Sequence, residues 1–507
     1  MNISIVVIIV YLGIFTIIGI MLNRGNKNAS DWATGSSNMS IWMLAAGVAG
    51  TRIGGAGTYG VAGDVMVSGI GNLWYGVNSL LALLLVGVFF AVPYRRLKLS
   101  STGQIFDRRF GSKRCQWLAS LCVQTEYLIV NIIEPFVIGS IVSGVTGLPF
   151  VYSVYLGGIV ILTFTATGGL KGTGITNIIH CTVIIFGLAL VGYMAMQDMG
   201  GWENLKIQTD AALLAADKDQ ASWWSFTGIG WITIIALFFS ATLHTPAASV
   251  YVNYSSSART EDNLLPGFFL AGILAAIMPL LAGFIGLEAL AKYGSESGLS
   301  SYRYITQLAT DTGPFIGGIA LAAILGALIS SGAPILLSSS TMFVNDWIPG
   351  SKDFSDEKRL HAYKITTVIY GFVATTIAWK ANISSVLQLL LLGFAMVVPP
   401  AIAIAYIFYW KRTTEKAAFF GMLAGYAGGL THWGLNTLYK GVDNATAGGF
   451  AQSWYELTQS LGEWQDPTFS ATIIPLVAIP LLTLLSSSGE ENELKEKFYN
   501  DISRVPA

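Results

Sequence analysis

The chain has 507 residues, of which 53% are hydrophobic and 11% are charged, and its formal net charge is −1. Soluble domains average about 25% charged residues, so this composition excludes an ordinary soluble protein. The chain also lacks the excess of Lys and Arg that nucleic-acid binding needs, so we expect no nucleic-acid partner. The three cysteines have neither metal-ligand spacing nor the spacing of a disulfide framework.

Thirteen apolar runs are long enough to cross a bilayer as helices. The first run has no basic residue before it and no small-residue cleavage site, so we expect a retained helix rather than a signal peptide. This pattern predicts an all-α, multi-pass membrane protein. In chain order, the predicted spans are 3–22, 40–69, 71–93, 115–145, 149–168, 173–197, 226–249, 264–289, 314–345, 360–380, 384–410, 416–438 and 468–486.

The basic residues predict the orientation of the chain. Twenty-one of the 28 Lys and Arg residues lie on the connections that follow the odd-numbered spans, or on the C-terminal segment. Six lie on the other connections, and the last is Arg52. Because Lys and Arg stay on the cytoplasmic side, we expect the N-terminus outside and the C-terminus in the cytoplasm, in a plasma or inner membrane.

The second predicted span contains the stretch Thr51-Arg52-Ile53-Gly54-Gly55. Adjacent glycines weaken a helix, and the carbonyls that they free need a new partner inside a membrane. An arginine at the centre of a membrane helix costs about 2.5–3.5 kcal/mol on insertion scales. A broken helix with a charge at the break is typical of a transporter site, where unwound carbonyls meet an ion. Glycine-mediated packing, with Arg52 paired to a carboxylate, is the alternative.

The ninth predicted span carries the adjacent serines Ser330 and Ser331, one turn after Ala327. Together these residues can offer two hydroxyls and a carbonyl on one face of a helix. Such oxygen ligands suit a hard cation such as sodium. Alternatively, the two hydroxyls bond only to carbonyls in the preceding turn, as is common in membrane helices.

Further segments, taken together with these two, resemble the sodium/solute symporter family over nearly the whole chain. The resemblance implies a leucine-transporter-like core of two inverted five-helix repeats. The segments are Asp31-Trp32-Ala33-Thr34-Gly35, the run from Phe164 to Leu170 followed by Thr176-Asn177, Asn345-Asp346, and the stretches Gly54–Gly63 and Phe89–Pro93, which are most similar to the choline-transporter-like branch.

This resemblance divides the chain into a first transmembrane helix with its cytoplasmic loop (1–39), a first repeat (40–197), a second repeat (198–412), two peripheral helices (413–488) and a cytoplasmic tail (489–507). The second repeat should open with a broken helix, as the first does. His244-Thr245-Pro246 is the expected break, because proline removes a donor and clashes with the preceding turn. His244 corresponds to an aromatic gate in sugar-carrying relatives; a packing histidine bonded to a carbonyl is the alternative.

The resemblance also implies the cation site, residue by residue. The family's shared sodium ion would be held by the carbonyls of Gly50, Ile53 and Ala327 and by the hydroxyls of Ser330 and Ser331.

Where many members of the family carry an Asp that serves a second sodium ion, this chain has Asn177. An amide cannot supply the negative charge that offsets a second cation. We therefore expect the second-sodium position to be lost and one Na+ to be bound per solute.

The nature of the solute depends most on Arg52. An arginine favours a carboxylate and repels a quaternary ammonium, although Glu126 or Glu134 could neutralise it. We expect a small polar solute that carries a carboxylate, an organic acid or an amino-acid-like molecule. The alternative is a choline-like, betaine-like or neutral polar solute. The expected solute-binding residues are Arg52, Gly54, Gly55, Trp74, Tyr75, Asn78, Glu126 and His244, of which Trp74, Tyr75 and Asn78 could instead serve packing alone.

Sodium-coupled import of this solute by alternating access is the function that the sequence favours. A membrane sensor is a second hypothesis, but too few residues follow 488 for a signalling domain. An enzyme is a third hypothesis, but the four histidines are scattered over four predicted spans, so we expect no enzyme. The expected partners are the solute and the lipid bilayer, and the expected assembly is a monomer or a weak homo-oligomer.

Overall fold

The computed structural model describes residues 3–23, 28–295, 299–381, 383–439, 466–486 and 493–503, together with residues 449, 452, 453, 456 and 457. Within them the regular secondary structure is helical, apart from an isolated β-bridge between Met39 and Ala258. The helices are α1 (Ile3–Asn23), α2 (Ala29–Thr34), α3 (Ile41–Gly55), α4 (Val61–Ser68), α5 (Trp74–Leu85), α6 (Ala91–Arg96), α7 (Gly103–Phe110), α8 (Lys113–Thr146), α9 (Phe150–Asp198), α10 (Trp202–Ala215), α11 (Gln220–Trp223), α12 (Trp231–Leu243), α13 (Ser249–Ser257), α14 (Leu264–Tyr293), α15 (Leu299–Asp311), α16 (Pro314–Met342), α17 (Asp356–Lys380), α18 (Val386–Tyr409), α19 (Glu415–Tyr439), α21 (Pro467–Leu485) and α22 (Glu493–Ser503).

Helical segments occupy all of the thirteen predicted ranges, which confirms the all-α prediction. Among the described residues, seven helices are long and apolar enough to cross a membrane, or eight if one bent pair counts as a span. The helix α9 runs through two predicted spans, 149–168 and 173–197, with a kink at Gly169 instead of a loop. The number of thirteen membrane spans therefore stays a prediction.

Two helices are broken at the places that the sequence predicts. In α3 the backbone of Gly54 has φ +47° and ψ −163°, and the chain continues through a π-helical turn, Ala56–Gly60, into α4. The helix α12 ends at Leu243, and the 3-10 turn Thr245–Ala247 leads into α13, which is bent by 50° from α12. Both breaks therefore lie inside the helical bundle, where backbone groups need partners from the protein.

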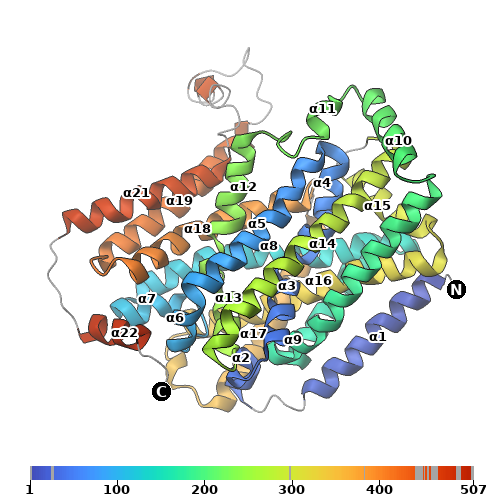
Figure 1. The fold of residues 1–507 in the computed structure, drawn as a ribbon. Coiled ribbons are helices and arrows are strands. Elements are labelled where there is room, and N and C mark those ends of the chain that lie inside the picture. The colour runs from blue at the N-terminus through green and yellow to red at the C-terminus, as the bar shows by residue number, and fades with distance from the viewer. Residues whose placement is uncertain are drawn as a thin grey trace.

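The helix α16 forms the centre of the bundle, where it packs against α9, α3, α8 and α1 (Figure 1). It is buried along nearly its whole length, from Gly317 to Met342. Many of its residues are Gly, Ala or Ser, and small residues let membrane helices approach closely. Peripheral helices such as α17 instead expose large apolar side chains, including Val368, Ile369 and Phe372, as expected of surfaces that face lipid.

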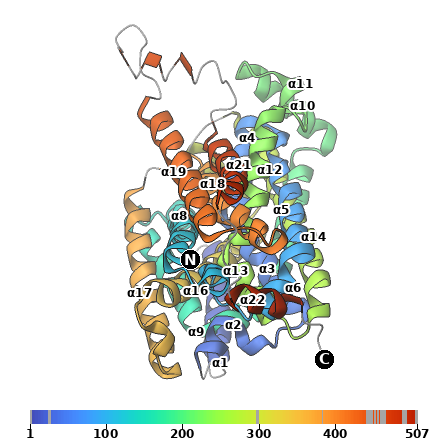
Figure 2. The ribbon, with the colours of Figure 1, turned by 90° about the vertical axis from the view of Figure 1, so that its left-hand side faces the viewer.

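The two ends of the bundle carry different short helices. The helices α10 and α11 lie at one end, and α2, α7 and α22 lie at the opposite end (Figures 1 and 2). The helix α22 packs on α6 and α7, with Phe498 only 2% exposed and the Tyr499 hydroxyl donating to the Ile407 carbonyl at 2.6 Å. The predicted tail 489–507 therefore contains an ordered helix; its residues 489–492 and 504–507, like most of the connection 440–465, lie outside the described residues.

Candidate functional site

The break in α3 is where three helices meet, and only glycine fits at its centre. A Cβ atom at Gly54 would lie 2.5 Å from Oε1 of Glu134 on α8 and 2.7 Å from Oγ of Ser331 on α16. The positive φ of Gly54 is also a conformation that other residues adopt only with strain. The glycine therefore permits both the turn and the close approach of the two polar side chains.

The oxygens of three predicted sodium ligands, Gly50, Ala327 and Ser330, come together beside this break. The Ser330 hydroxyl donates to the Ala327 carbonyl at 2.8 Å and to the Gly50 carbonyl at 3.1 Å. The Ser330 hydroxyl therefore bonds to the preceding turn of its own helix, and it also contacts α3. The Ile53 carbonyl accepts the N–H of Ala56. A carbonyl oxygen has a second lone pair, so this bond leaves it able to contact a cation.

The fifth predicted ligand, Ser331, faces a carboxylate. Its hydroxyl donates to Oε1 of Glu134 at 2.5 Å and to the Leu328 carbonyl at 3.3 Å. The backbone N–H of Gly55 donates to the same carboxylate, at 3.0 Å to Oε2 and 3.2 Å to Oε1. The buried Glu134 thus joins the break in α3 to the serine pair of α16.

Asn177, at the expected second-sodium position, serves the backbone of α16. Pro334 has no N–H, so the Ser330 carbonyl, four residues earlier, loses its helical donor. The Nδ2 of Asn177 donates to this carbonyl at 3.1 Å and to the Gly47 carbonyl at 3.4 Å. Asn177 therefore flanks Ser330 with a neutral amide, while Glu134 flanks Ser331 with a carboxylate.

Arg52 is 3% exposed and is held by the protein itself. Its Nε donates to the Ser79 hydroxyl at 3.1 Å, its second terminal nitrogen donates to the Ala241 carbonyl, and its first lies 3.4 Å from Nε2 of His244. No ion pair joins Arg52 to Glu126 within the described part of the chain. The guanidinium also lies over the rings of Tyr75 and Phe394, at 5.7 and 5.1 Å.

A small cavity of about 20 Å³ lies at the break. This is room for about one water molecule, so a larger solute requires the lining side chains to move. The charged residues of the lining are Arg52, Glu126 and Glu134, and Oε2 of Glu126 is buried without a hydrogen-bond partner in the described residues. The whole lining consists of Thr51, Arg52, Ile53, Gly54, Ala56, Glu126, Val130, Ile133, Glu134, Val250, Tyr251, Ser331, Ile335, Leu390 and Phe394.

Some of the predicted solute residues lie behind the cavity rather than on its wall. The Tyr75 hydroxyl donates to the Arg52 carbonyl, and His244 stacks on Phe394 with ring centroids 3.8 Å apart. Trp74 donates to the Phe226 carbonyl at 2.8 Å, outside the lining. The remaining two, Gly55 and Asn78, are buried but are also absent from the lining.

Of the lining residues that were not predicted to bind solute or sodium, three carry a charge or an aromatic ring: Glu134, Tyr251 and Phe394. The carboxylate of Glu134 was a detectable signal, because an ionisable residue inside a membrane span is expensive and marks a site. Phe394 is a single aromatic residue within an apolar run, and Tyr251 lies just past the predicted span 226–249, so no sequence pattern sets either residue apart.

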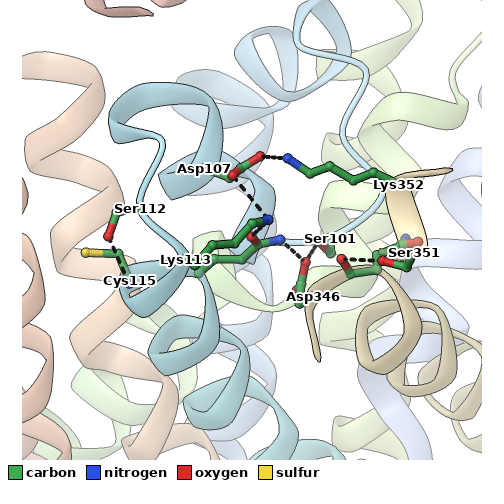
Figure 3. A network of polar contacts seen from close by, with 10 residues as sticks. Ser101, Asp107, Ser112, Lys113, Cys115, Asp346, Ser351 and Lys352 are labelled. Carbon is green, nitrogen blue, oxygen red and sulfur yellow. Dashed lines mark hydrogen bonds and ion pairs between the residues drawn. The ribbon is translucent and has the colours of Figure 1, made fainter. Parts of the chain in front are cut away.

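A second polar region lies at the end of the bundle that carries α7 and α22, and Figure 3 shows its network. Asp346 accepts from Ser101 and Gln116, each at 2.7 Å, while Asp107 pairs with Lys352 at 2.6 Å and Lys113 at 3.3 Å. Burial raises the pKa of Asp107, but the bonds and charges of the two lysines outweigh it and hold that pKa below its usual range. The network ties α7 and α8 to the turns that follow α16.

Comparisons with known proteins agree with this architecture. The model of the sodium:solute symporter family matches residues 32–425. The sodium/glucose cotransporter of Vibrio parahaemolyticus is 23% identical over 458 residues, which cover 83% of each protein. The sodium/proline symporter of Staphylococcus aureus is 22% identical over 447 residues, which cover 83% of this chain and 84% of that one.

Two solved structures share the fold. A Na+-coupled sialic acid symporter in a substrate-bound outward-open state superposes with a TM-score of 0.76 at 18% identity, over 96% of this chain and 98% of that chain. MhsT in complex with L-phenylalanine gives a TM-score of 0.55 at 14% identity, over 88% and 98%. At these identities the likeness concerns the fold alone, which is the leucine-transporter-like fold with two broken helices that the sequence predicts.

Proposed function

The chain belongs to the sodium:solute symporter family, and from this premise we propose that it imports a small polar, carboxylate-bearing solute together with sodium by alternating access. Sodium-coupled symport in a membrane follows from the family. The solute, the ion stoichiometry and the binding residues are our proposal. The observation that carries it is the meeting of hydroxyl and carbonyl oxygens at the break of α3, next to a cavity lined by Arg52, Glu126 and Glu134.

We assign the sodium ion to the oxygens of Gly50, Ile53, Ala327, Ser330 and Ser331. These groups are neutral oxygen donors, the kind of ligand that a hard cation prefers. The contact of Ser330 with Gly50 supports the assignment, because a cation there would bond to α3 and α16 at once. Asn177 offers no negative charge, which supports one sodium ion per solute.

The charges of the cavity favour a solute with no net charge. Two carboxylates, Glu126 and Glu134, face one guanidinium, Arg52. When the carboxylates are ionised and one sodium ion is bound, these charges cancel. Buried charges are tolerated only when they are paired, so a zwitterion keeps the site balanced, whereas a simple anion does not. Among the carboxylate-bearing solutes, an amino-acid-like molecule is therefore the better fit.

Two groups support the binding of a zwitterion. The Arg52 head has five N–H donors, and its polar contacts with Ser79, Ala241 and His244 leave donors for a solute carboxylate. The unpartnered Oε2 of Glu126 can accept from the solute ammonium. Each charged end of the solute would then meet the opposite charge on the protein.

A choline-like, betaine-like or neutral polar solute is the second candidate. The excess of carboxylates over guanidinium favours it, because either carboxylate attracts a cation. The aromatic rings argue against a quaternary ammonium: Arg52 lies over Tyr75 and Phe394, and His244 stacks on Phe394. Those ring faces are already used by side chains of the protein itself.

We also propose the orientation and the domain boundaries that the sequence predicts. The basic residues favour an N-terminus outside and a cytoplasmic C-terminus, with the α22 end of the bundle inside. The proposed repeats are 40–197 and 198–412, each opening with one of the two broken helices. The expected assembly, a monomer or a weak homo-oligomer, stays a prediction.

Uptake into proteoliposomes tests the proposal. The purified protein would face an inward sodium gradient, with an inward potassium gradient as the control. Labelled amino acids, organic acids, quaternary amines and sugars would be compared. We expect accumulation of a zwitterion that requires sodium and is not competed by choline. Accumulation of a quaternary amine or a sugar in its place would contradict the solute class, and accumulation without sodium would contradict the coupling.

A further inference from the structure

The Glu134 carboxylate is buried beside the proposed sodium ligands without a positively charged partner. Its side chain lies on α8 and the residue is 2% exposed. Its hydrogen-bond donors are the Ser331 hydroxyl and the Gly55 N–H, and both groups are neutral. Within the described residues no ion pair includes Glu134, and the guanidinium of Arg52 is bonded to Ser79, Ala241 and His244 instead.

The charge of an ionised Glu134 carboxylate is not balanced by the groups around it. An ionised carboxylate inside a membrane protein is costly unless a cation or several donors offset its charge. Two neutral donors offset only part of it. Ser331 is one of the residues assigned to sodium, and its hydroxyl contacts Glu134. A sodium ion on that serine therefore supplies the charge that the carboxylate lacks.

We propose that Glu134 supplies the negative charge of the sodium site and acts on the ion through Ser331. Because the Ser331 hydroxyl donates its hydrogen to the carboxylate, its oxygen lone pairs remain for the cation. A hydrogen bond to a charged acceptor also makes that oxygen a stronger ligand. Glu134 is thus a positioning residue behind the ligand and not a ligand itself. The inference rests on the proposed sodium-coupled function.

The position of Asn177 strengthens this inference. Asn177 and Glu134 each contact one residue of the serine pair: Asn177 donates to the Ser330 carbonyl, and Glu134 accepts from the Ser331 hydroxyl. The chain has a neutral amide at residue 177, where many family members have a carboxylate, but it has a carboxylate at residue 134, beside the same serine pair. The two glycines at the break fit the same scheme, because a Cβ at Gly54 would displace the Glu134 carboxylate.

Equilibrium binding of ²²Na+ to the purified protein, without any solute, tests the proposal. Glu134→Gln keeps the size and the hydrogen-bonding ability of the side chain and removes its charge. Partners behind a metal ligand typically change metal affinity about 10- to 100-fold, and we expect a loss of sodium affinity of that size. Glu288→Gln is the matched control, since Glu288 is a fully buried carboxylate on α14 that does not line the cavity at the break. We expect no change in its affinity for sodium.

If Glu134→Gln does not fold, Glu134→Asp retains the charge but draws it away from Ser331. It should weaken sodium binding about tenfold, and wild-type affinity in that variant would overturn the proposal.

Other outcomes separate this inference from the proposed function. Wild-type protein that binds no sodium would overturn the function itself. Wild-type protein that binds sodium, together with unchanged affinity in Glu134→Gln, would overturn only the role of Glu134. A loss of solute affinity at saturating sodium, with sodium affinity intact, would also overturn it, because Glu134 would then act on the solute. An equal loss of sodium affinity in Glu288→Gln would also overturn the proposal, because the loss would then reflect general destabilisation of the protein.

Discussion

The Ser330 hydroxyl lies 3.1 Å from the Gly50 carbonyl oxygen, across the contact between α16 and the broken helix α3. The two residues belong to helices that are far apart in the sequence and adjacent in the core. A cation bound at this contact would favour the conformation in which the helices touch. A ligand shifts a conformational equilibrium only through such differential contacts, so the contact offers a physical route from sodium binding to the shape of the solute site.

Removal of the serine hydroxyls should weaken sodium binding. Ser330→Ala and Ser331→Ala each delete one oxygen ligand with little change in volume. A hydrogen bond to a charged group contributes about 1.5–3 kcal/mol, so we expect sodium affinity to fall roughly 10-fold or more. Solute affinity should fall with it through reciprocal linkage.

The measurement is solute uptake against sodium concentration for each variant. Ser340→Ala is the control, because Ser340 lies on the same buried helix and its hydroxyl contacts the Leu337 carbonyl and the Thr367 hydroxyl, neither of which is an assigned ligand. The assignment fails if both Ser330→Ala and Ser331→Ala keep the wild-type dependence on sodium.

Substitution of the central glycine should abolish transport. Gly54→Ala places a Cβ 2.5 Å from Glu134 Oε1 and 2.7 Å from Ser331 Oγ, at a positive φ. Gly147→Ala is a matched control, since Gly147 also has a positive φ, +72°, but a Cβ there meets nothing within 4 Å. We expect Gly147→Ala to lower thermal stability slightly and to preserve uptake, and Gly54→Ala to lose uptake. Equal uptake in the two variants would show that the close approach at Gly54 is unimportant.

Arg52 tests the solute class. Arg52→Lys keeps the charge but loses the planar fork, and it should weaken solute binding by roughly 1.5–3 kcal/mol, the range for a hydrogen bond to a charged group. Arg52→Gln should nearly abolish uptake while the protein remains in the membrane. Solute competition and quantification of protein in the membrane fraction measure the two effects.

A scaffold role for Arg52 makes a different forecast. If Arg52 serves only to neutralise Glu126, then Arg52→Gln combined with Glu126→Gln should restore transport of the native solute. We expect no recovery, because the guanidinium bonds to Ser79 and Ala241 and makes no ion pair with Glu126 in the described residues. Recovery of transport at wild-type solute affinity would show that Arg52 has a structural role and does not bind the solute.

The sequence predicts the breaks well because their causes are local. Gly54 and Pro246 change the backbone by their own chemistry, whatever surrounds them. The separate spans 149–168 and 173–197 were less predictable. The single positive φ of Gly169 turns the chain without forming a loop, so one kinked helix, α9, replaces two spans and a connection.

The composition of the cavity wall was harder to predict. Nearly every position of a membrane helix is apolar, so periodicity does not tell which face meets the cavity. Phe394 and Tyr251 reach it only because α18 and α13 pack against the broken helix as they do. For the same reason the sequence identifies Glu134 as an unusual residue but not its partners, Ser331 and Gly55.

The ion pair at the α7 end of the bundle should make stability depend on pH. The pKa of Asp107 is lowered in the folded protein, so its contribution is full above the unfolded value, near 3.9, and is lost as pH falls through the folded value. Lys352→Met should therefore lower thermal stability at pH 7, and this effect should shrink as pH falls below about 3.9, the unfolded value. Since Lys352 is 60% exposed, we expect less than about 1 kcal/mol.

Thermal unfolding of the detergent-solubilised protein measures this effect. Lys358→Met is the control, because Lys358 lies over the Phe354 ring, 4.1 Å from its centroid, and has no carboxylate partner in the described residues. Its effect should be the same at pH 3 and pH 7. A Lys352→Met effect that also stays constant with pH would show that the pairing with Asp107 does not stabilise the fold.

The central claim is that one sodium ion enters with each solute through the oxygens of Ser330 and Ser331. Parallel measurement of ²²Na+ and labelled-solute entry into the same proteoliposomes, with membrane voltage clamped at zero, tests it most directly. We predict one sodium ion per solute in the wild type, a hyperbolic dependence on sodium, and a joint loss of both fluxes in the double variant Ser330→Ala/Ser331→Ala. Two sodium ions per solute with a sigmoidal dependence, or sodium-driven solute entry that survives in the double variant, would contradict the account.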